Sequence, residues 1–565
     1  MSRTTSASPE QTEPYYDLGS YHRSIETPSP QAQVWFDRGL VWAYAFNHEE
    51  AIHCFERALA LDPELAIARW GIAYAIGPNY NKAWDAFDPV DLTASLTRAR
   101  TELHLATTGR STAVERGLIE ALATRFPTAD PNDVDALAAA HARYADAMAE
   151  LASAHPDDVD VQALAADALV NVTAWALWDG ATGEPAPGSR VVEAKRILDR
   201  ALATPAGRAH PGVLHLYLHA MEMSAHPEQA LPAADLLRGL VPDAGHLQHM
   251  PSHIDVLCGD YHSSVVANQI AVKADRRFVE RRGPLNFYSL YRAHDLHFVV
   301  YSAMFEGQFQ VALDAADELA AQLTPELLSI ASPPMADWLE AFVPLRVHVL
   351  IRFGRWDELI AEPLPVDVDL YCTTAATIHY GRGVAHAAKG QLDAARGERA
   401  AFAAAYARIP DSRYLFNNTS RDILAVAEAM LDGEIAYRER RFDDAFASLR
   451  LAIERDDALP YDEPWGWMQP ARHAYGALLL EQGRLEEAAA AYAADLGFDA
   501  TLNRSCQHPG NVWSLHGYHE CLQKLGRTAE AVIIGRQLEL AQARADVPIL
   551  ASCACRLDVG GTCCD

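Results

Sequence analysis

The chain has 565 residues, 50% of them hydrophobic, and its 76 acidic side chains outnumber 47 Lys and Arg, which gives a formal charge of -29. Such a charge repels phosphate backbones and anionic lipids, so it excludes nucleic-acid and membrane-surface binding as functions. Neither a run of eighteen apolar residues nor an apolar leader in residues 1–30 is present, so we expect a cytoplasmic protein. Nine unevenly spaced cysteines do not suggest a disulfide scaffold.

Helix-forming residues dominate the whole chain. Ala, Leu, Glu and Arg are abundant, whereas strand-like runs bounded by Asn-Gly or Asp-Gly turns are scarce. The composition therefore predicts an all-α protein. We expect residues 1–31 to form a flexible N-terminal segment ahead of the first helix.

The segment "VWFDRGLVWAYAFNHEEAIHCFERALALDP" predicts two antiparallel helices that end at Asp62-Pro63. Counted from Ala32, six residues occupy positions 4, 8, 20, 24, 27 and 32 of a repeat: Trp35, Gly39, Ala51, Phe55, Ala58 and Pro63. This pattern resembles a tetratricopeptide repeat, in which small residues let two helices cross and bulky ones fill the layer between neighbours. The resemblance implies a superhelical solenoid of helix pairs.

Three further units of this kind begin at Pro211, Gly245 and Ala293. In each unit, positions 2, 5, 9 and 12 share one face of the first helix and are expected to face the concave groove. Seven of these twelve positions are histidine, although 23 histidines in 565 residues predict fewer than one there. The seven are His215, His219, His246, His249, His253, His294 and His297, and an eighth position holds Glu222.

A single helical histidine is ordinarily a packing or surface residue, but seven on one stripe favour a shared function. Neutral imidazole binds zinc, copper, nickel and iron, and side chains four apart on a helix can hold one ion. His215 with His219, and His249 with His253, have this spacing. The alternative is a metal-free groove that binds anions when its imidazoles are protonated.

Neighbouring residues carry subsidiary predictions. Glu222 is a candidate ligand, or a general base for a bound water, and Tyr301 is a candidate to hydrogen-bond a substrate. Asp295 is expected to point off the stripe into solvent. Because Pro251 suits the first turn of a helix, His246 and His249 are expected on the preceding loop.

The Pro- and Asp-rich stretch "EPLPVDVDL" at residues 362–370 predicts a seam in the array. An array at residues 32–361 would carry the histidines, and a second at 371–545 repeats the small-residue pattern at Gly433, Gly476 and Gly526.

Residues 546–565 are expected to form a flexible, cysteine-rich tail. Cys553, Cys555, Cys563 and Cys564 are candidate ligands for a soft ion such as Cu(I) or Zn(II). The alternative is that these thiols are incidental, or that they oxidise to a disulfide.

Longer strings add a more specific resemblance. "AFNHEEAIHCFERALALDP", "HPGVLHLYLHAME", "GHLQHMPSHI" and "HDLHF" resemble a family of bacterial tetratricopeptide-repeat proteins with a central histidine cluster. The resemblance covers residues 34–540 and implies that the seven histidines and Glu222 form the cluster of that family. It implies no particular reaction, and the cysteine-rich tail lies outside its pattern.

The leading hypothesis from the sequence is a metal-dependent oxidoreductase that acts on a small molecule, with copper or non-haem iron in a mono- or dinuclear centre. A zinc-dependent hydrolase using Glu222, and a metal storage or delivery protein, are alternatives. A further alternative is an interaction scaffold that holds a peptide in its concave groove.

Overall fold

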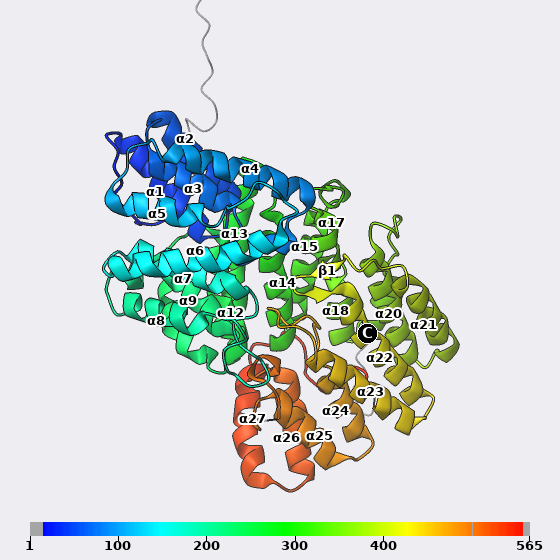
Figure 1. The fold of residues 1–565 in the computed structure, drawn as a ribbon. Helices are drawn as coiled ribbons and strands as arrows, with labels where there is room; N and C mark the ends of the chain where they lie inside the picture. The colour runs from blue at the N-terminus through cyan, green and yellow to red at the C-terminus, as the bar shows by residue number, and fades with distance from the viewer. Residues whose placement is uncertain (1–14, 500, 558–565) are drawn as a thin grey trace, which may run out of the picture.

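The computed structural model describes residues 15–499 and 501–557, and nearly all of its regular structure is helical (Figure 1). The helices of the first part are α1 (Pro30–Tyr44), α2 (His48–Leu61), α3 (Ala66–Ile76), α4 (Pro89–Ala106), α5 (Ala113–Ala123), α6 (Val134–Ala154), α7 (Val159–Val170) and α8 (Val191–Leu202). Those of the central part are α9 (Pro211–Glu222), α10 (Leu231–Leu237), α11 (Gly245–His249), α12 (Pro251–Cys258), α13 (Tyr261–Arg282), α14 (Ser289–Glu306), α15 (Phe309–Gln322), α16 (Pro325–Leu328), α17 (Met335–Leu339), α18 (Leu345–Arg352) and α19 (Trp356–Ala361).

The last part contains α20 (Cys372–Ala388), α21 (Leu392–Tyr406), α22 (Ser420–Arg438), α23 (Phe442–Asp457), α24 (Ala471–Glu481), α25 (Leu485–Asp495), α26 (Val512–Lys524) and α27 (Thr528–Gln542). Two short strands, β1 (Tyr414–Leu415) and β2 (Asn418–Thr419), pair antiparallel. The predicted all-α class is confirmed. Every helix of the described ranges is too short or too polar to cross a lipid bilayer.

Successive helices pack as hairpins, and glycines at the crossings leave room for aromatic rings. The Phe55 ring of α2 packs against Gly39 of α1 and Gly71 of α3, where an added Cβ would lie 2.5 and 2.8 Å from the ring. Tyr492 of α25 packs in the same way against Gly476 of α24, where a Cβ would lie 2.5 Å from the ring. Gly39 and Gly476, which the sequence predicts as small repeat positions, are therefore required by the packing.

Both ends of the described chain pack against the central helices. The Asp17 N–H donates to Asp243 Oδ2 at 2.7 Å, and Tyr16 is buried in the core. At the other end, the Phe309 N–H donates to Asp546 Oδ1 at 2.6 Å, and Ile549 is buried. The described parts of residues 1–31 and 546–565, which the sequence predicts to be flexible, are therefore packed on the helices, with Tyr16 against Trp42 and Phe278 and Ile549 close to Gly307.

The predicted seam is a loop, and the same hydrophobic core continues on both sides of it. Residues 362–371 connect α19 to α20, but one hydrophobic core contains Leu359 before the loop and Ala376 after it. Gly381 of α20 lies so close to α18 that an added Cβ would be 2.6 Å from Val347 Cγ1. The two predicted arrays therefore share one interior.

Candidate metal centre

Four helices bring the predicted histidines into the interior of the protein. Their positions are His215 and His219 on α9, His246 and His249 on α11, His253 on α12, and His294 and His297 on α14. None of these side chains is more than 6% exposed. The stripe predicted from the repeat register does converge, but it is enclosed and does not line an open groove.

The helices α11 and α12 keep His249 and His253 one turn apart. Met250, which joins the two helices, has φ -49° and ψ -37°, so the chain continues almost as one helix into Pro251. The expectation that His246 and His249 lie on a loop is therefore wrong. Proline is tolerated in the first turn of α12 because no helical acceptor is needed for its missing N–H.

His215, His219 and His246 form a first group, in which one ligand atom of each lies within 4.8 Å of the others. The His215 Nδ1–H donates to the Tyr44 carbonyl at 2.6 Å, and His219 Nδ1 lies 2.9 Å from Glu222 Oε1. These contacts leave Nε2 of both rings without a hydrogen-bond partner, and neither nitrogen of His246 has one. Buried unpaired nitrogens are costly, whereas a metal ion would satisfy them, and such outer contacts are typical of metal-bound histidines.

His249, His253 and His294 form a second group of the same size. The His249 Nδ1–H donates to Asn268 Oδ1 at 2.6 Å, while His253 Nδ1 lies 2.9 Å from Glu222 Oε2. The Nε2 atoms of His249 and His253 are only 2.7 Å apart. When both Nδ1 atoms act as donors, two lone pairs face each other, and the arrangement requires a proton or a cation between them. Metal–imidazole bonds of about 2.0–2.1 Å allow one ion to reach both nitrogens.

The two groups adjoin and share a carboxylate. The ring centroids of His246 and His249 are 5.5 Å apart, and those of His219 and His253 are 5.8 Å apart. One oxygen of Glu222 contacts His219 and the other contacts His253. Glu222 therefore links two sets of three histidines.

Burial sets the electrostatics of the cluster. Desolvation holds the pKa of each of five imidazoles well below its ordinary value, and neighbouring imidazoles add to the effect; they are His215, His219, His246, His249 and His294. Burial likewise raises the pKa of Glu222 to about 8, and it raises the pKa of Glu463, whose Oε2 lies 2.6 Å from His253 Nδ1. The site thus presents neutral imidazoles and carboxyl groups that a bound cation would ionise.

A cavity of about 470 Å³ adjoins the cluster. Its histidine-rich wall contains His219, His246, His253, His294 and Glu463. Aromatic side chains form much of the remaining wall: Tyr80, Trp175, Phe287, Tyr291, Trp338, Tyr414 and Phe416. A volume in this range is typical of sites that bind small molecules.

Three residues for which the sequence predicts a position near the metal or in solvent lie elsewhere in the structure. Tyr301 is buried against Phe305, with ring centroids 4.4 Å apart, and is not part of the described cavity wall. His297 lies outside both groups, with Nε2 3.0 Å from Met468 Sδ. Asp295, which was expected in solvent, is fully buried with Oδ1 3.5 Å from His249 Nδ1, because the layer formed by α13 covers that side of α14.

Sequence reasoning missed three residues that support the cluster. Glu463 and Asn268 hold imidazoles through the contacts given above, and Phe46 packs against His215 with ring centroids 4.4 Å apart. Asn268 and Phe46 lie within or beside predicted repeat helices, where the sequence does not distinguish them from ordinary packing residues. Only their contacts in the structure identify their role. Glu463 has no repeat spacing to the histidines, and the packing of the chain alone brings it near.

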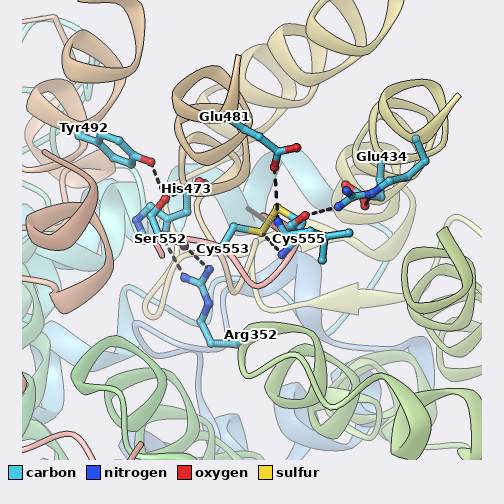
Figure 2. The surroundings of a disulfide bond; sticks show 10 residues. Arg352, Glu434, His473, Glu481, Tyr492, Ser552, Cys553 and Cys555 are labelled. Carbon is cyan, nitrogen blue, oxygen red and sulfur yellow. Dashed lines mark hydrogen bonds and ion pairs between the residues drawn. A yellow bond between two sulfur atoms is a disulfide. The ribbon is translucent and has the colours of Figure 1, made fainter. Parts of the chain in front are cut away.

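Two of the four predicted cysteine ligands, Cys553 and Cys555, belong to the described residues and lie near Arg352 and His473 (Figure 2). Cys553 and Cys555 are joined in a disulfide, so in this state neither offers a thiolate to a metal ion. The segment is held by Arg352, whose Nη2 donates to the Ser552 carbonyl at 2.8 Å, and by Ser552 Oγ, which donates to the His473 carbonyl at 3.0 Å. Cys563 and Cys564 lie outside the described residues.

Comparison with known proteins supports the repeat assignment. Residues 32–65 match the tetratricopeptide-repeat family model, which is the unit that the sequence predicts from Ala32. No curated protein is detectably similar in sequence to the chain.

Solved structures share only a loose likeness. Yeast Tom70 is 10% identical, with a TM-score of 0.29, over 91% of this chain and 93% of that chain. The P58(IPK) TPR domain is 14% identical, with a TM-score of 0.18, over 74% and 99% of the two chains, and the Naa15/Naa10 complex with HypK-THB is 14% identical, with a TM-score of 0.19, over 91% and 79%. None of these likenesses bears on activity. The match at residues 32–65 thus identifies one tetratricopeptide repeat, which lies at the start of an array of helix hairpins.

Proposed function

We propose that the buried histidine cluster binds a transition metal, copper or non-haem iron, and that the protein is a metal-dependent oxidoreductase acting on a small molecule in the adjoining cavity. The contact between Nε2 of His249 and Nε2 of His253, 2.7 Å apart and enclosed, carries this proposal. Neutral imidazole is the ligand that copper and iron share, and a carboxylate in the outer shell strengthens it as a donor.

The arrangement favours two ions. Each group supplies three imidazoles, and Glu222 supports one member of each group through its two oxygens. An ion with an open coordination position supplies oxygen chemistry when bound. The protein contributes the orientation of the rings, the exclusion of water from a buried site and a cavity beside His246 and His294.

The contacts of Glu222 favour this function over a zinc-dependent hydrolase. A general base needs a free oxygen within reach of the reacting water. Both oxygens of Glu222 contact imidazoles instead, and Glu222 is not among the described residues that line the cavity. We therefore assign Glu222 the role of orienting His219 and His253.

Metal analysis of protein made without a histidine tag tests the proposal. We expect two copper or iron ions per chain in the wild type, and loss of the metal in the double variant His249→Ala, His253→Ala. His226→Ala is the matched control, because its side chain is 67% exposed and contacts Glu228. Wild-type protein that retains no metal and gains no thermal stability from copper, iron or zinc would contradict the proposal.

An interaction scaffold is the second candidate, and one observation favours it. The last helix, α27, exposes Val532, Ile533 and Leu540, which are 56%, 61% and 76% exposed. An apolar end face of a helical array is suited to contact with another protein. Metal-free protein that captures a partner through α27, and loses it in Leu540→Glu, would favour the scaffold over the enzyme.

A further inference from the structure

We infer that the cavity takes an aromatic molecule without a negative charge as its ligand, an inference that rests on the proposed function and specifies its substrate class. Aromatic rings of the cavity wall lie beside three of the four imidazoles that line it. The Tyr80 ring lies 4.5 Å from that of His219, Tyr291 lies 4.8 Å from His246, and Phe416 lies 4.7 Å from His294, measured between centroids. A planar ring that reaches the imidazoles would therefore pack against other rings on several sides.

The charges of the cavity wall disfavour an anionic ligand. Lys82 is held by Asp91, and its Nζ lies 4.0 Å from the Phe87 ring centroid, so its charge is already matched. Glu463 contacts His253 and Tyr461. The remaining charged residue of the wall, Asp85, is exposed and carries a negative charge. An anionic ligand would therefore lose its hydration without gaining a free cationic partner, whereas a neutral polar group can share the amides of Asn81 and Asn417 at a smaller desolvation cost.

Calorimetry on metal-free protein with three matched probes tests this inference. We expect 2-naphthol to bind at least tenfold tighter than decahydro-2-naphthol, its saturated counterpart, and than 2-naphthoate, its anionic counterpart. Trp175→Leu, at a wall position 5.2 Å from the Tyr80 ring, should remove the preference for the aromatic probe. Equal binding of the three probes, tighter binding of naphthoate, or no binding would overturn the inference. Since no metal is present, this outcome is separate from the test of metal binding.

A second inference comes from the backbone at the hairpin turns. Six turns place glycine at a left-handed position with φ between 66° and 81°: Gly259, Gly307, Gly354, Gly390, Gly483 and Gly526. In each turn, the residue that follows the glycine donates its N–H to the carbonyl of the residue five positions before that donor, as Asp260 does to Asp255. Glycine suits this motif because a Cβ is unfavourable there.

Two turns of the same geometry lack glycine. Phe46, between α1 and α2, has φ 55°, and Arg440, between α22 and α23, has φ 61°. Arg440 is exposed, whereas Phe46 is buried and its ring lies 4.4 Å from that of His215 and 5.7 and 5.6 Å from those of His219 and His246. A bulky residue thus occupies an unfavourable backbone position where it contacts every member of the first group. Such residues gather at functional sites.

The remaining two non-glycine residues with positive φ among those described are also aromatic and line the cavity. They are Trp175, with φ 57°, and Phe416, with φ 48°. We propose that Phe46 is a positioning residue, whose ring fixes the orientation of the first group of imidazoles. This role rests on the proposed metal centre.

Copper titration of Phe46→Gly and of the control Arg440→Gly tests the role, with affinity measured against a competing chelator. We expect Phe46→Gly to weaken binding at least tenfold and to alter the Cu(II) electron paramagnetic resonance spectrum, because the imidazole directions change. Arg440→Gly should leave both unchanged, and Phe46→Tyr should restore them. If Phe46→Gly does not fold, Phe46→Leu, which keeps bulk without an aromatic face, gives the same comparison. Unchanged affinity and spectrum in a folded variant would overturn the role, whereas wild-type protein that binds no ion would overturn the metal centre itself.

Discussion

Asn268 fixes the direction in which His249 presents its free nitrogen. Its Oδ1 accepts from His249 Nδ1–H at 2.6 Å, and its Nδ2 donates to the Ser264 carbonyl at 2.8 Å, so the amide has only one satisfactory orientation. Nε2 of His249 is therefore held as an acceptor, directed at His253.

The first prediction concerns Asn268→Ala. Loss of an outer hydrogen bond to a metal-bound histidine typically lowers metal affinity by about 10–100-fold, and we expect a decrease of that size. Chelator competition on the purified variant measures it. Asn171→Ala is the control, because this buried amide donates to the Asp167 carbonyl at 2.8 Å and contacts no cluster residue. Equal losses in both variants would point to general destabilisation instead.

The second prediction concerns the pH dependence of metal-free protein. Cluster imidazoles with pKa values held well below 6.5 stay neutral in the fold but take up protons on unfolding, so stability is lost as pH falls below about 6.5. Each proton contributes about 1.4 kcal/mol per pH unit. The carboxyl of Glu222, with its pKa raised from 4.5 to about 8, has the opposite effect, and stability is lost as pH rises toward 8.

Because several imidazoles take up protons when the protein unfolds at low pH, the free energy of unfolding should fall more steeply below pH 6.5 than above it. Thermal unfolding from pH 5 to 8.5 should show a maximum near pH 6.5, with a larger decrease below it than above it. A bound ion at one hundred times its dissociation constant should add about 2.7 kcal/mol and reduce the alkaline loss, since it favours ionised Glu222. A flat profile in metal-free protein would argue against buried neutral imidazoles.

The third prediction tests the packing at the helix crossings. Gly39→Ala places a Cβ 2.5 Å from the Phe55 ring, which must shift, and overpacking of this kind costs about 1–3 kcal/mol. Gly397→Ala is the control in α21, where no atom lies within 4 Å of the added Cβ, and it should gain up to about 1 kcal/mol. Chemical denaturation of both variants makes the comparison, and a neutral Gly39→Ala would show that the crossing is loosely packed.

The fourth prediction concerns the cysteine pair. Cys553 and Cys555 line a small pocket together with Arg352 and His473, and they belong to neither histidine group. The double variant Cys553→Ser, Cys555→Ser should therefore retain the metal content of the wild type. Metal analysis of the two proteins, purified side by side, decides the matter. Loss of one equivalent in the variant would assign the pair a metal site of its own.

The sequence by itself determined the helical class, the repeat at residues 32–65 and the seven-histidine stripe. These features are local: a glycine at a crossing, a proline in a first turn and a spacing of three or four residues each act within one hairpin, so they can be read from neighbouring residues. Only the tertiary structure decided that the stripe is enclosed, that Glu463 and Asn268 hold two of its rings, and that Tyr301 and His297 stand outside it. Those outcomes depend on how α13 and the segments around residues 175, 416 and 463 pack over α9 to α14. Contacts between residues far apart in sequence form only when the whole array folds, so no spacing in the sequence predicts them.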